Sequence, residues 1–250
     1  MERMKRGIAL GLTLATLVFP GACGSGDENS APSQTQPASA TTAKIMPLGD
    51  SITASVTGQH SYRYYLWHLA LDKGYRIDFV GSQHGVSDGS PVSTDFDMDH
   101  EGHAGWRADQ ILTQIQGWAT AASPDFVLIH LGTNDLCQGQ SAESTVGDVG
   151  AIIDVLRTVN PKVEILLAQI IATTFGCGIP AFNAQLPVLV SAKTSTDSPI
   201  VLVDQYTGFD PATMTWDGLH PNAQGESQMA DRWFAKLAPM LDAFFAGSGQ

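Results

Sequence analysis

Five short apolar runs, several of them continuous rather than alternating, constrain the fold of this 250-residue chain more than any other feature. A strand with one wet face alternates apolar and polar residues, whereas a strand covered on both faces is apolar throughout. The runs therefore predict strands inside a sheet that carries helices on both faces. They are Lys44–Leu48, Arg76–Val80, Asp125–Leu131, Val163–Ile171 and Ile200–Val203.

Patterns of helical period lie between these runs. In the clearest of them, Ile111, Ile115 and Trp118 recur on one helix face. Pro239 should kink or break the last helix. Strands that alternate with helices predict an α/β fold, with a doubly wound parallel sheet of about five strands. The helical segments are 61–73, 107–120, 145–159 and 223–245.

The first 22 residues have the features of an export signal. Basic residues precede the apolar stretch Ile8–Phe19, which is too short to span a bilayer. Cys23 follows a small residue directly after this stretch, as in bacterial lipoprotein cleavage sites. We therefore expect a signal peptide at 1–22 and a secreted protein, with lipid attachment at Cys23 as a cell-surface tether. The alternative is secretion without an anchor.

Residues 23–42 contain mostly Gly, Ser, Ala, Pro, Gln and Thr, with almost no large apolar side chain. Such a segment cannot bury enough surface to offset the entropy of ordering, so we expect a flexible linker. The expected organisation is a signal peptide at 1–22, a linker at 23–42 and one folded domain at 43–250.

Charge and cysteine content exclude several classes of partner. Thirteen Lys and Arg against 25 Asp and Glu give a net charge of −12, which disfavours nucleic acid and anionic membrane surfaces because both require a basic face. Three cysteines are too few for a four-thiolate zinc site. If Cys23 carries lipid, Cys137 and Cys177 remain, and an oxidising compartment favours a disulfide between them. The alternative is two free thiols.

Polar segments follow several of the predicted strands. Gly49–Ser51 follows the first strand, Gly132–Asp135 the third and Asp217–His220 the fifth. Taken alone, each could be a helix cap or a turn. In doubly wound sheets, however, ligands bind at the carboxyl ends of the strands, so we expect these segments to meet.

Together these segments supply the groups needed for acyl transfer. Ser51 can act as a nucleophile and His220 as the base that takes its proton, while Asp217 can orient the imidazole. The side-chain N–H of Asn134 and the backbone N–H of Gly105, which follows a long predicted loop at 82–104, can stabilise an oxyanion.

These three segments, together with the one that contains Gly105, resemble in order the four sequence blocks of the SGNH (GDSL-type) hydrolase family. The resemblance covers residues 43–247. It implies a three-layer α/β/α sandwich of flavodoxin-like type. It also implies a Ser51, Asp217 and His220 triad, and an oxyanion hole formed by the N–H groups of Ser51 and Gly105 and the Asn134 side chain. Gly102 is the alternative to Gly105. The blocks are Gly49-Asp50-Ser51, Glu101-Gly102-His103-Ala104-Gly105-Trp106, Gly132-Thr133-Asn134-Asp135 and Asp217-Gly218-Leu219-His220.

Three stretches look like the carbohydrate-esterase branch of this family, whose members remove acetyl groups from polysaccharides such as xylan. An acylated carbohydrate is therefore the expected substrate, and Asp50, His103 and Trp106 are candidate contacts. The alternatives are a lipase or general short-chain carboxylesterase, an acyl transferase, and a non-catalytic glycan-binding lipoprotein. The stretches are Ser61-Tyr62-Arg63-Tyr64, Asp78-Phe79-Val80-Gly81-Ser82 and Glu101-Gly102-His103-Ala104-Gly105-Trp106.

The mechanism implied by the resemblance requires no cofactor and no metal. His100, Glu101 and His103 are close in sequence, but they lack the spacing of two His residues four apart on one helix face. We expect Arg63 to sit on a helix with its guanidinium in solvent, and we expect the protein to be a monomer.

Overall fold

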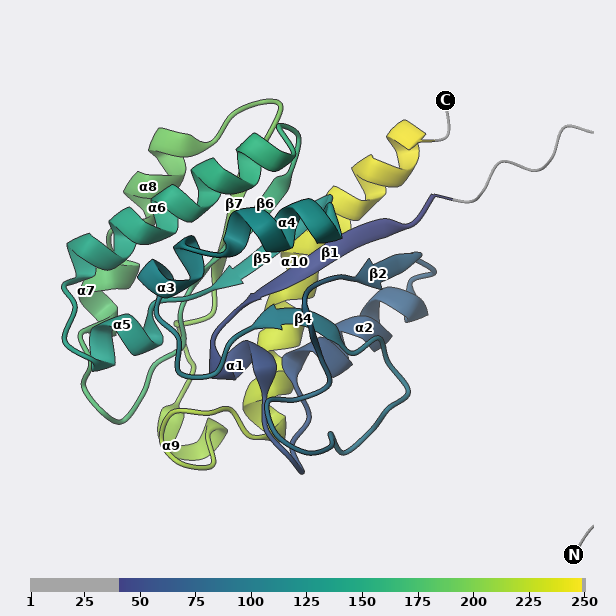
Figure 1. The fold of residues 1–250 in the computed structure, drawn as a ribbon. Helices are drawn as coiled ribbons and strands as arrows, with labels where there is room; N and C mark the ends of the chain where they lie inside the picture. Colours follow the sequence, from purple (N-terminus) through teal and green to yellow (C-terminus); the bar gives the residue numbers. More distant parts are fainter. Residues whose placement is uncertain (1–40, 249–250) are drawn as a thin grey trace, which may run out of the picture. The chain divides into compact units, whose positions relative to one another are not determined.

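Strand β1 (Ala43–Gly49) is the centre of the sheet in the computed structural model, which describes residues 41–248 (Figure 1). The sheet order is β3-β4-β1-β5-β6-β7, and β2 pairs with the first half of β1 while β4 pairs with its end. All pairs are parallel except β3–β4. The other strands are β2 (Ile77–Phe79), β3 (Gln83–His84), β4 (Asp99–Gly102), β5 (Phe126–His130), β6 (Glu164–Gln169) and β7 (Ile200–Asp204).

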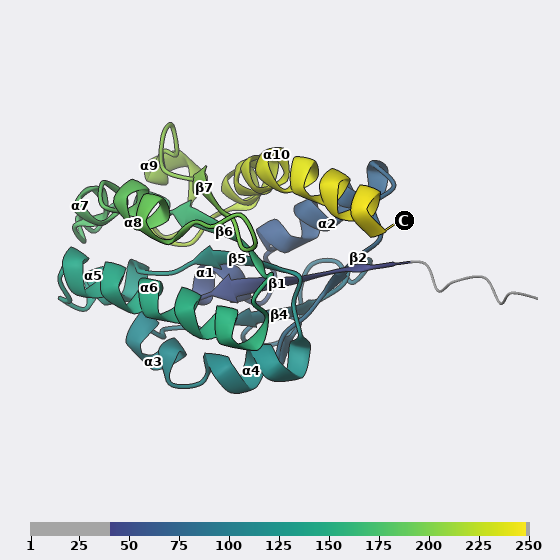
Figure 2. The same cartoon turned by 90° about the horizontal axis from the view of Figure 1, so that it is seen from above.

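Two apolar clusters cover the two faces of this sheet, so the expected three-layer α/β arrangement is confirmed (Figure 2). Helices α2 and α10 pack on one face, and α3, α4, α6, α7 and α8 contribute to the cluster on the other. The helices are α1 (Ser51–Ala54), α2 (Tyr62–Asp72), α3 (Ala108–Leu112), α4 (Ile115–Ala122), α5 (Thr133–Cys137), α6 (Ala142–Val159), α7 (Ile179–Asn183), α8 (Leu186–Lys193), α9 (Pro211–Met214) and α10 (Ala223–Ser248).

All five predicted strands form, but the expectation of one long loop at 82–104 is wrong, because β3 and β4 lie within it. The sequence of β4 is Asp-His-Glu-Gly, which contains no apolar run that would predict a strand. Its buried side chains are polar and are held by hydrogen bonds instead. His100 Nδ1 accepts the Gly102 N–H at 2.9 Å, and Glu101 accepts the Ser82 hydroxyl at 2.6 Å.

Two helix predictions also need correction. The segment 107–120 forms two helices, α3 and α4, because the Thr113 hydroxyl bonds back to the Gln110 carbonyl at 2.7 Å where α3 ends. Pro239 lies inside α10 without ending it. The fully buried side chains of Trp233, Leu237 and Leu241 anchor the helix on both sides of this proline, and their packing outweighs the lost hydrogen bond.

The expected signal peptide at 1–22, Cys23 and all but the last two residues of the expected linker at 23–42 lie outside the described residues. Across 41–248, none of the helices combines the length and the apolar character that crossing a bilayer requires.

The expectation that the Arg63 guanidinium is in solvent is wrong, since the whole residue is buried. Its nitrogens donate to the carbonyls of Thr53 (2.9 Å) and Met98 (2.9 Å), and also to those of Ala54 and Gly85. Burial lowers the pKa of Arg63 to about 10, which leaves it charged at neutral pH. The side chain thereby ties the end of α1 to the segment before β4.

We predict that Arg63→Met lowers the free energy of unfolding by about 3 kcal/mol, because four buried or partly buried carbonyls lose their donor. Arg63→Lys should lose less, since it keeps the charge but fewer N–H groups. Urea unfolding monitored by tryptophan fluorescence measures both. Arg76→Met, at an exposed arginine, is the matched control. Equal urea midpoints for the two methionine variants would contradict the role given to Arg63.

Candidate active site

Ser51, His220 and Asp217 form a continuous chain of hydrogen bonds. Ser51 Oγ lies 2.9 Å from His220 Nε2, and His220 Nδ1 lies 2.7 Å from Asp217 Oδ2. Asp217 Oδ1 also accepts the backbone N–H groups of Leu219 and His220. The imidazole is thus oriented by the carboxylate and presents its second nitrogen to the hydroxyl, a geometry that can move a proton from Ser51 to His220.

Hydrogen bonds keep Asp217 in its charged form. Partial burial acts to raise the pKa of Asp217, but the bonds donated by the His220 backbone, the His220 ring and the Leu219 backbone outweigh it. The pKa of Asp217 therefore lies below its usual value. An ionised Asp217 can stabilise the imidazolium that forms when His220 accepts a proton.

The topology of the sheet explains how residues so far apart in sequence meet. Ser51 follows β1, while Asp217 and His220 follow β7. β5 and β6 lie between these two strands, a separation of about 14 Å at normal strand spacing. The segment 205–222 therefore has to return across the end of β6 to reach Ser51.

Two features fix this returning segment. Thr174, which follows β6, donates its N–H to the Gly218 carbonyl at 2.8 Å. Gly218 has a φ of +89°, and a Cβ there would lie 2.2 Å from Thr174 Oγ1, so the contact requires glycine. Asn222 bonds to the Thr213 carbonyl through Nδ2 and caps the start of α10 through Oδ1.

Sequence reasoning missed Thr174 and Asn222 as supports of the site. An asparagine just before a helical pattern is a recognisable cap, so the signal for Asn222 was present. Thr174 carries no such signal, because its contact with Gly218 joins segments 44 residues apart.

The predicted oxyanion donors lie on both sides of Ser51. β4 and β5 both pair with β1, so Gly105, after β4, and Asn134, after β5, flank the residue that follows β1. Within 41–248, the backbone N–H groups of Ser51 and Gly105 donate to no protein atom. One N–H of Asn134 Nδ2 is held by the Trp106 carbonyl at 2.9 Å, which orients the amide and leaves its second N–H for a ligand.

The alternative donor, Gly102, is engaged elsewhere. Its N–H bonds to His100 Nδ1, and a Cβ at this position would lie 2.6 Å from the Ala54 nitrogen. Gly105, by contrast, is exposed and has a φ of +79°, a conformation that glycine adopts without strain. The geometry therefore favours Gly105 over Gly102.

The expectation that Asp50 contacts the substrate is wrong, because only 1% of its surface is exposed. Its Oδ1 caps α1 by accepting the Ile52 N–H at 2.9 Å. Burial, together with the smaller effect of the nearby Asp135, raises the pKa of Asp50 to about 7. Thr133 is close enough to lower this pKa, yet neither Thr133 Oγ1 nor Asp50 Oδ2 completes a hydrogen bond within the described residues.

His103 and Trp106, the other expected contacts, belong to a packed cluster. The His103 ring stacks on Trp118 at 4.2 Å between centroids and packs against Trp106 at 4.9 Å. His103 Nε2 lies 2.6 Å from Glu101 Oε1, and only 10% of the His103 side chain is exposed. Among residues 41–248, no three His, Cys, Asp or Glu side chains lie together as metal ligands.

A disulfide joins Cys137 and Cys177, as the cysteine count predicts. Cys137 ends α5, the helix that carries Asn134, and Cys177 follows β6 in the same loop as Thr174. The bond thus links the loop that carries the candidate oxyanion donor to the loop that contacts Gly218.

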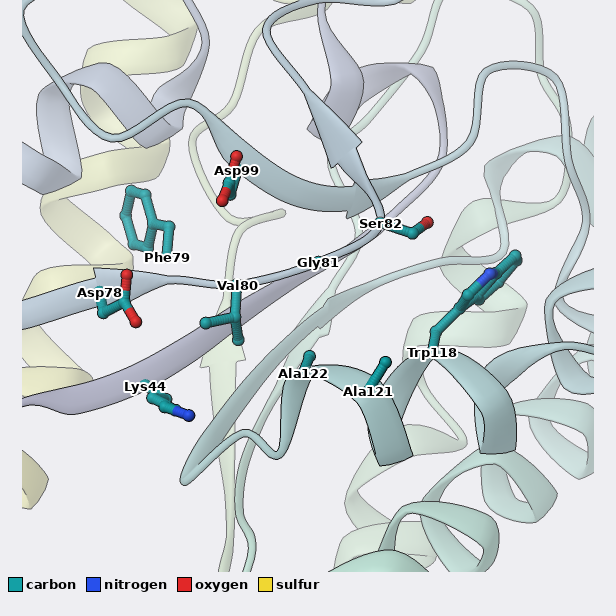
Figure 3. Close-up of a pocket in the computed structure, with 10 residues that line it drawn as sticks. All are labelled: Lys44, Asp78, Phe79, Val80, Gly81, Ser82, Asp99, Trp118, Ala121 and Ala122. Atoms are coloured by element: carbon teal, nitrogen blue, oxygen red, sulfur yellow. The ribbon is translucent and has the colours of Figure 1, made fainter.

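A pocket of about 320 Å³ lies at the other end of β1 (Figure 3). Lys44 and Asp78 line it near the starts of their strands, about 20 Å along β1 from Ser51 at normal strand rise. None of the residues of the triad or the candidate oxyanion hole lines it. This pocket is therefore separate from the candidate active site.

Comparison with known proteins places the same residues in a family context. The sequence model of the GDSL-like Lipase/Acylhydrolase family matches residues 48–227, which include Ser51, Asn134 and His220. The multidomain esterase of Ruminococcus flavefaciens is 28% identical over 228 residues. That match covers 81% of this chain and 29% of the relative, so the chain spans less than a third of that protein.

Two solved structures resemble the chain over nearly their whole length. A mutant acetyl esterase crystallised with acetate ion is 32% identical, with a TM-score of 0.74, and the match covers 81% of this chain and 99% of that one. A family 3 carbohydrate esterase from Clostridium thermocellum is 35% identical, with a TM-score of 0.72, covering 82% and 99%.

The pKa of Asp50 predicts a pH dependence of stability. Because the pKa is raised from 3.8 to about 7 in the folded state, the folded protein binds a proton that the unfolded chain releases. The resulting stabilisation is complete below the unfolded-state pKa and is lost as the pH rises through 7. Between pH 5.5 and 8.5 the Tm should fall about 5 °C more in the wild type than in Asp50→Asn.

Differential scanning calorimetry across this pH range measures the effect. Asp88→Asn, which removes an exposed carboxylate, controls for the change in net charge. Parallel Tm curves for the wild type and Asp50→Asn would disprove the assignment.

Proposed function

The chain belongs to the GDSL-like lipase/acylhydrolase family, and on that basis we propose that it is a serine esterase that removes acetyl groups from a polysaccharide such as xylan. The hydrogen-bonded chain from Ser51 through His220 to Asp217 is the observation that carries this proposal.

In the first half of the reaction, Ser51 Oγ attacks the ester carbonyl carbon while His220 Nε2 takes its proton. The negative charge that develops on the carbonyl oxygen is stabilised by the N–H groups of Ser51 and Gly105 and by Asn134 Nδ2. His220 then gives its proton to the oxygen of the departing alcohol, the C–O bond breaks, and the acyl group remains on Ser51.

In the second half, water replaces the alcohol. His220 takes a proton from the water as its oxygen attacks the acyl carbon, and the same donors stabilise the oxyanion. His220 returns the proton to Ser51 Oγ as the acid leaves. Asp217 stays ionised throughout and stabilises the imidazolium at each step.

Two observations favour an acetylated carbohydrate. Two solved structures that are 32% and 35% identical to the chain are an acetyl esterase and a family 3 carbohydrate esterase. The features of an export signal at 1–22 suit a polymeric substrate that cannot enter a cell. We therefore also propose that the protein is secreted, with Cys23 as a site for a lipid anchor. A lipase or general short-chain esterase is the second candidate, because the family name covers both.

The experiment that tests this function compares esters with purified protein. Initial rates are measured on p-nitrophenyl esters of increasing acyl length and on acetylated xylan, with Ser51→Ala as the control. Activity confined to acetyl esters, extending to xylan and absent in Ser51→Ala, is the expected result. A preference for longer acyl chains would assign the protein to the lipase or general esterase class instead.

Asn134 supplies a sharper test of the mechanism. Asn134→Ala should lower kcat by about 10²–10³ with little change in KM, because the lost hydrogen bond forms mainly in the transition state. Steady-state kinetics on the best p-nitrophenyl ester provide the measurement. Glu143→Ala, at an exposed residue in the first turn of α6, the helix that follows α5, controls for general disturbance of this region. An unchanged kcat for Asn134→Ala would remove this residue from the oxyanion hole.

A further inference from the structure

Trp216 is an exposed aromatic residue in direct contact with the candidate catalytic histidine. Its ring stacks on the His220 ring, with centroids 5.3 Å apart and planes 15° from parallel, and 49% of its surface is exposed. Its backbone N–H donates to the His220 carbonyl at 3.0 Å. The stack is offset, since the centroid distance exceeds a direct ring-on-ring contact, so part of the indole extends past the imidazole.

The chemistry of ester cleavage determines which part of the substrate lies beside this indole. His220 Nε2 has to protonate the oxygen of the departing alcohol, so that oxygen lies within hydrogen-bond distance of the imidazole. The carbonyl oxygen lies toward Gly105 and Asn134 instead. The alcohol part of the ester, rather than the acyl part, is therefore the group that extends toward Trp216.

A second exposed aromatic residue lies on the adjoining loop. Phe175 is 62% exposed and directly follows Thr174, whose N–H bonds to the Gly218 carbonyl two residues after Trp216. Five large hydrophobic residues are exposed within 41–248, and the two that are aromatic lie on these two loops. Exposed apolar surface grouped at one place on a protein indicates a binding surface.

We propose that Trp216 and Phe175 form an aromatic rim that binds sugar rings of the polymer that carries the scissile ester. The apolar faces of pyranose rings, which expose C–H groups, stack on aromatic rings, whereas their hydroxyls remain in water. The chain's net charge of −12 would repel an acidic polysaccharide, so a neutral one is the expected occupant of the rim. This inference rests on the proposed esterase function and specifies how its substrate is recognised.

The kinetic test compares two acetyl esters that differ only in their alcohol. The ratio of kcat/KM for acetylated xylo-oligosaccharides to kcat/KM for ethyl acetate should fall about ten-fold in Trp216→Ala and in Phe175→Ala, mainly through KM. Trp216→Phe should keep most of the ratio, because it retains an aromatic face. Val188→Ala, at an exposed residue on α8, is the control and should leave the ratio unchanged.

If the ratio of the two kcat/KM values stays constant in both alanine variants, the proposal of an aromatic rim is wrong. If Trp216→Ala lowers kcat/KM equally on both esters, Trp216 does not belong to the rim. It is then a positioning residue for His220. A shift of acyl-chain preference in either variant would also overturn the proposal, because it would place the acyl group at the rim.

A binding measurement separates this proposal from the proposed function. Isothermal titration of Ser51→Ala with acetylated xylo-oligosaccharides should show binding that weakens about ten-fold when Trp216→Ala or Phe175→Ala is added. If the wild type cleaves no ester but this binding pattern holds, the esterase proposal fails and the rim stands. If Ser51→Ala does not bind the oligosaccharides, or the added substitutions have no effect, the rim is wrong.

Discussion

The common direction of β1, β5, β6 and β7 is the constraint on which the rest of the structure depends. Parallel pairing puts the carboxyl ends of these four strands, and that of β4, at one edge, so every loop that carries a candidate catalytic group begins there. The same topology separates β7 from β1 by two strands. The loop with Asp217 and His220 must therefore cross the sheet edge, and it needs supports along its path.

These supports couple the two halves of the site. The Cys137–Cys177 disulfide joins the helix of Asn134 to the loop after β6, and Thr174 in that loop holds the Gly218 carbonyl between Asp217 and His220. The candidate oxyanion donor and the triad therefore share one framework. Such sharing suits catalysis by preorganised dipoles, in which small displacements of a donor reduce the stabilisation of charge.

Buried polar groups support the other side of the site. Asp50 caps α1, the short helix that begins with Ser51. Arg63 donates hydrogen bonds to backbone carbonyls near the end of α1 and in the segment before β4. Glu226, at the start of α10, is 2% exposed, and burial raises its pKa well above the usual value. A buried charged group reduces stability when it is unpaired, but Asp50 and Arg63 each fix a loop that apolar packing alone would leave loosely defined.

The sequence by itself determined five of the strands, the α/β class and the three residues of the hydrogen-bonded chain Ser51, His220 and Asp217, because continuous apolar runs and the polar segments that follow them are local patterns. It did not reveal β4, whose buried His100 and Glu101 replace apolar side chains with hydrogen bonds. It placed Asp50 and Arg63 in contact with substrate or solvent, since burial of a charged residue depends on partners distant in sequence. Only the tertiary structure decided these positions and the stacking of Trp216 on His220, because both arise where loops from different strands converge.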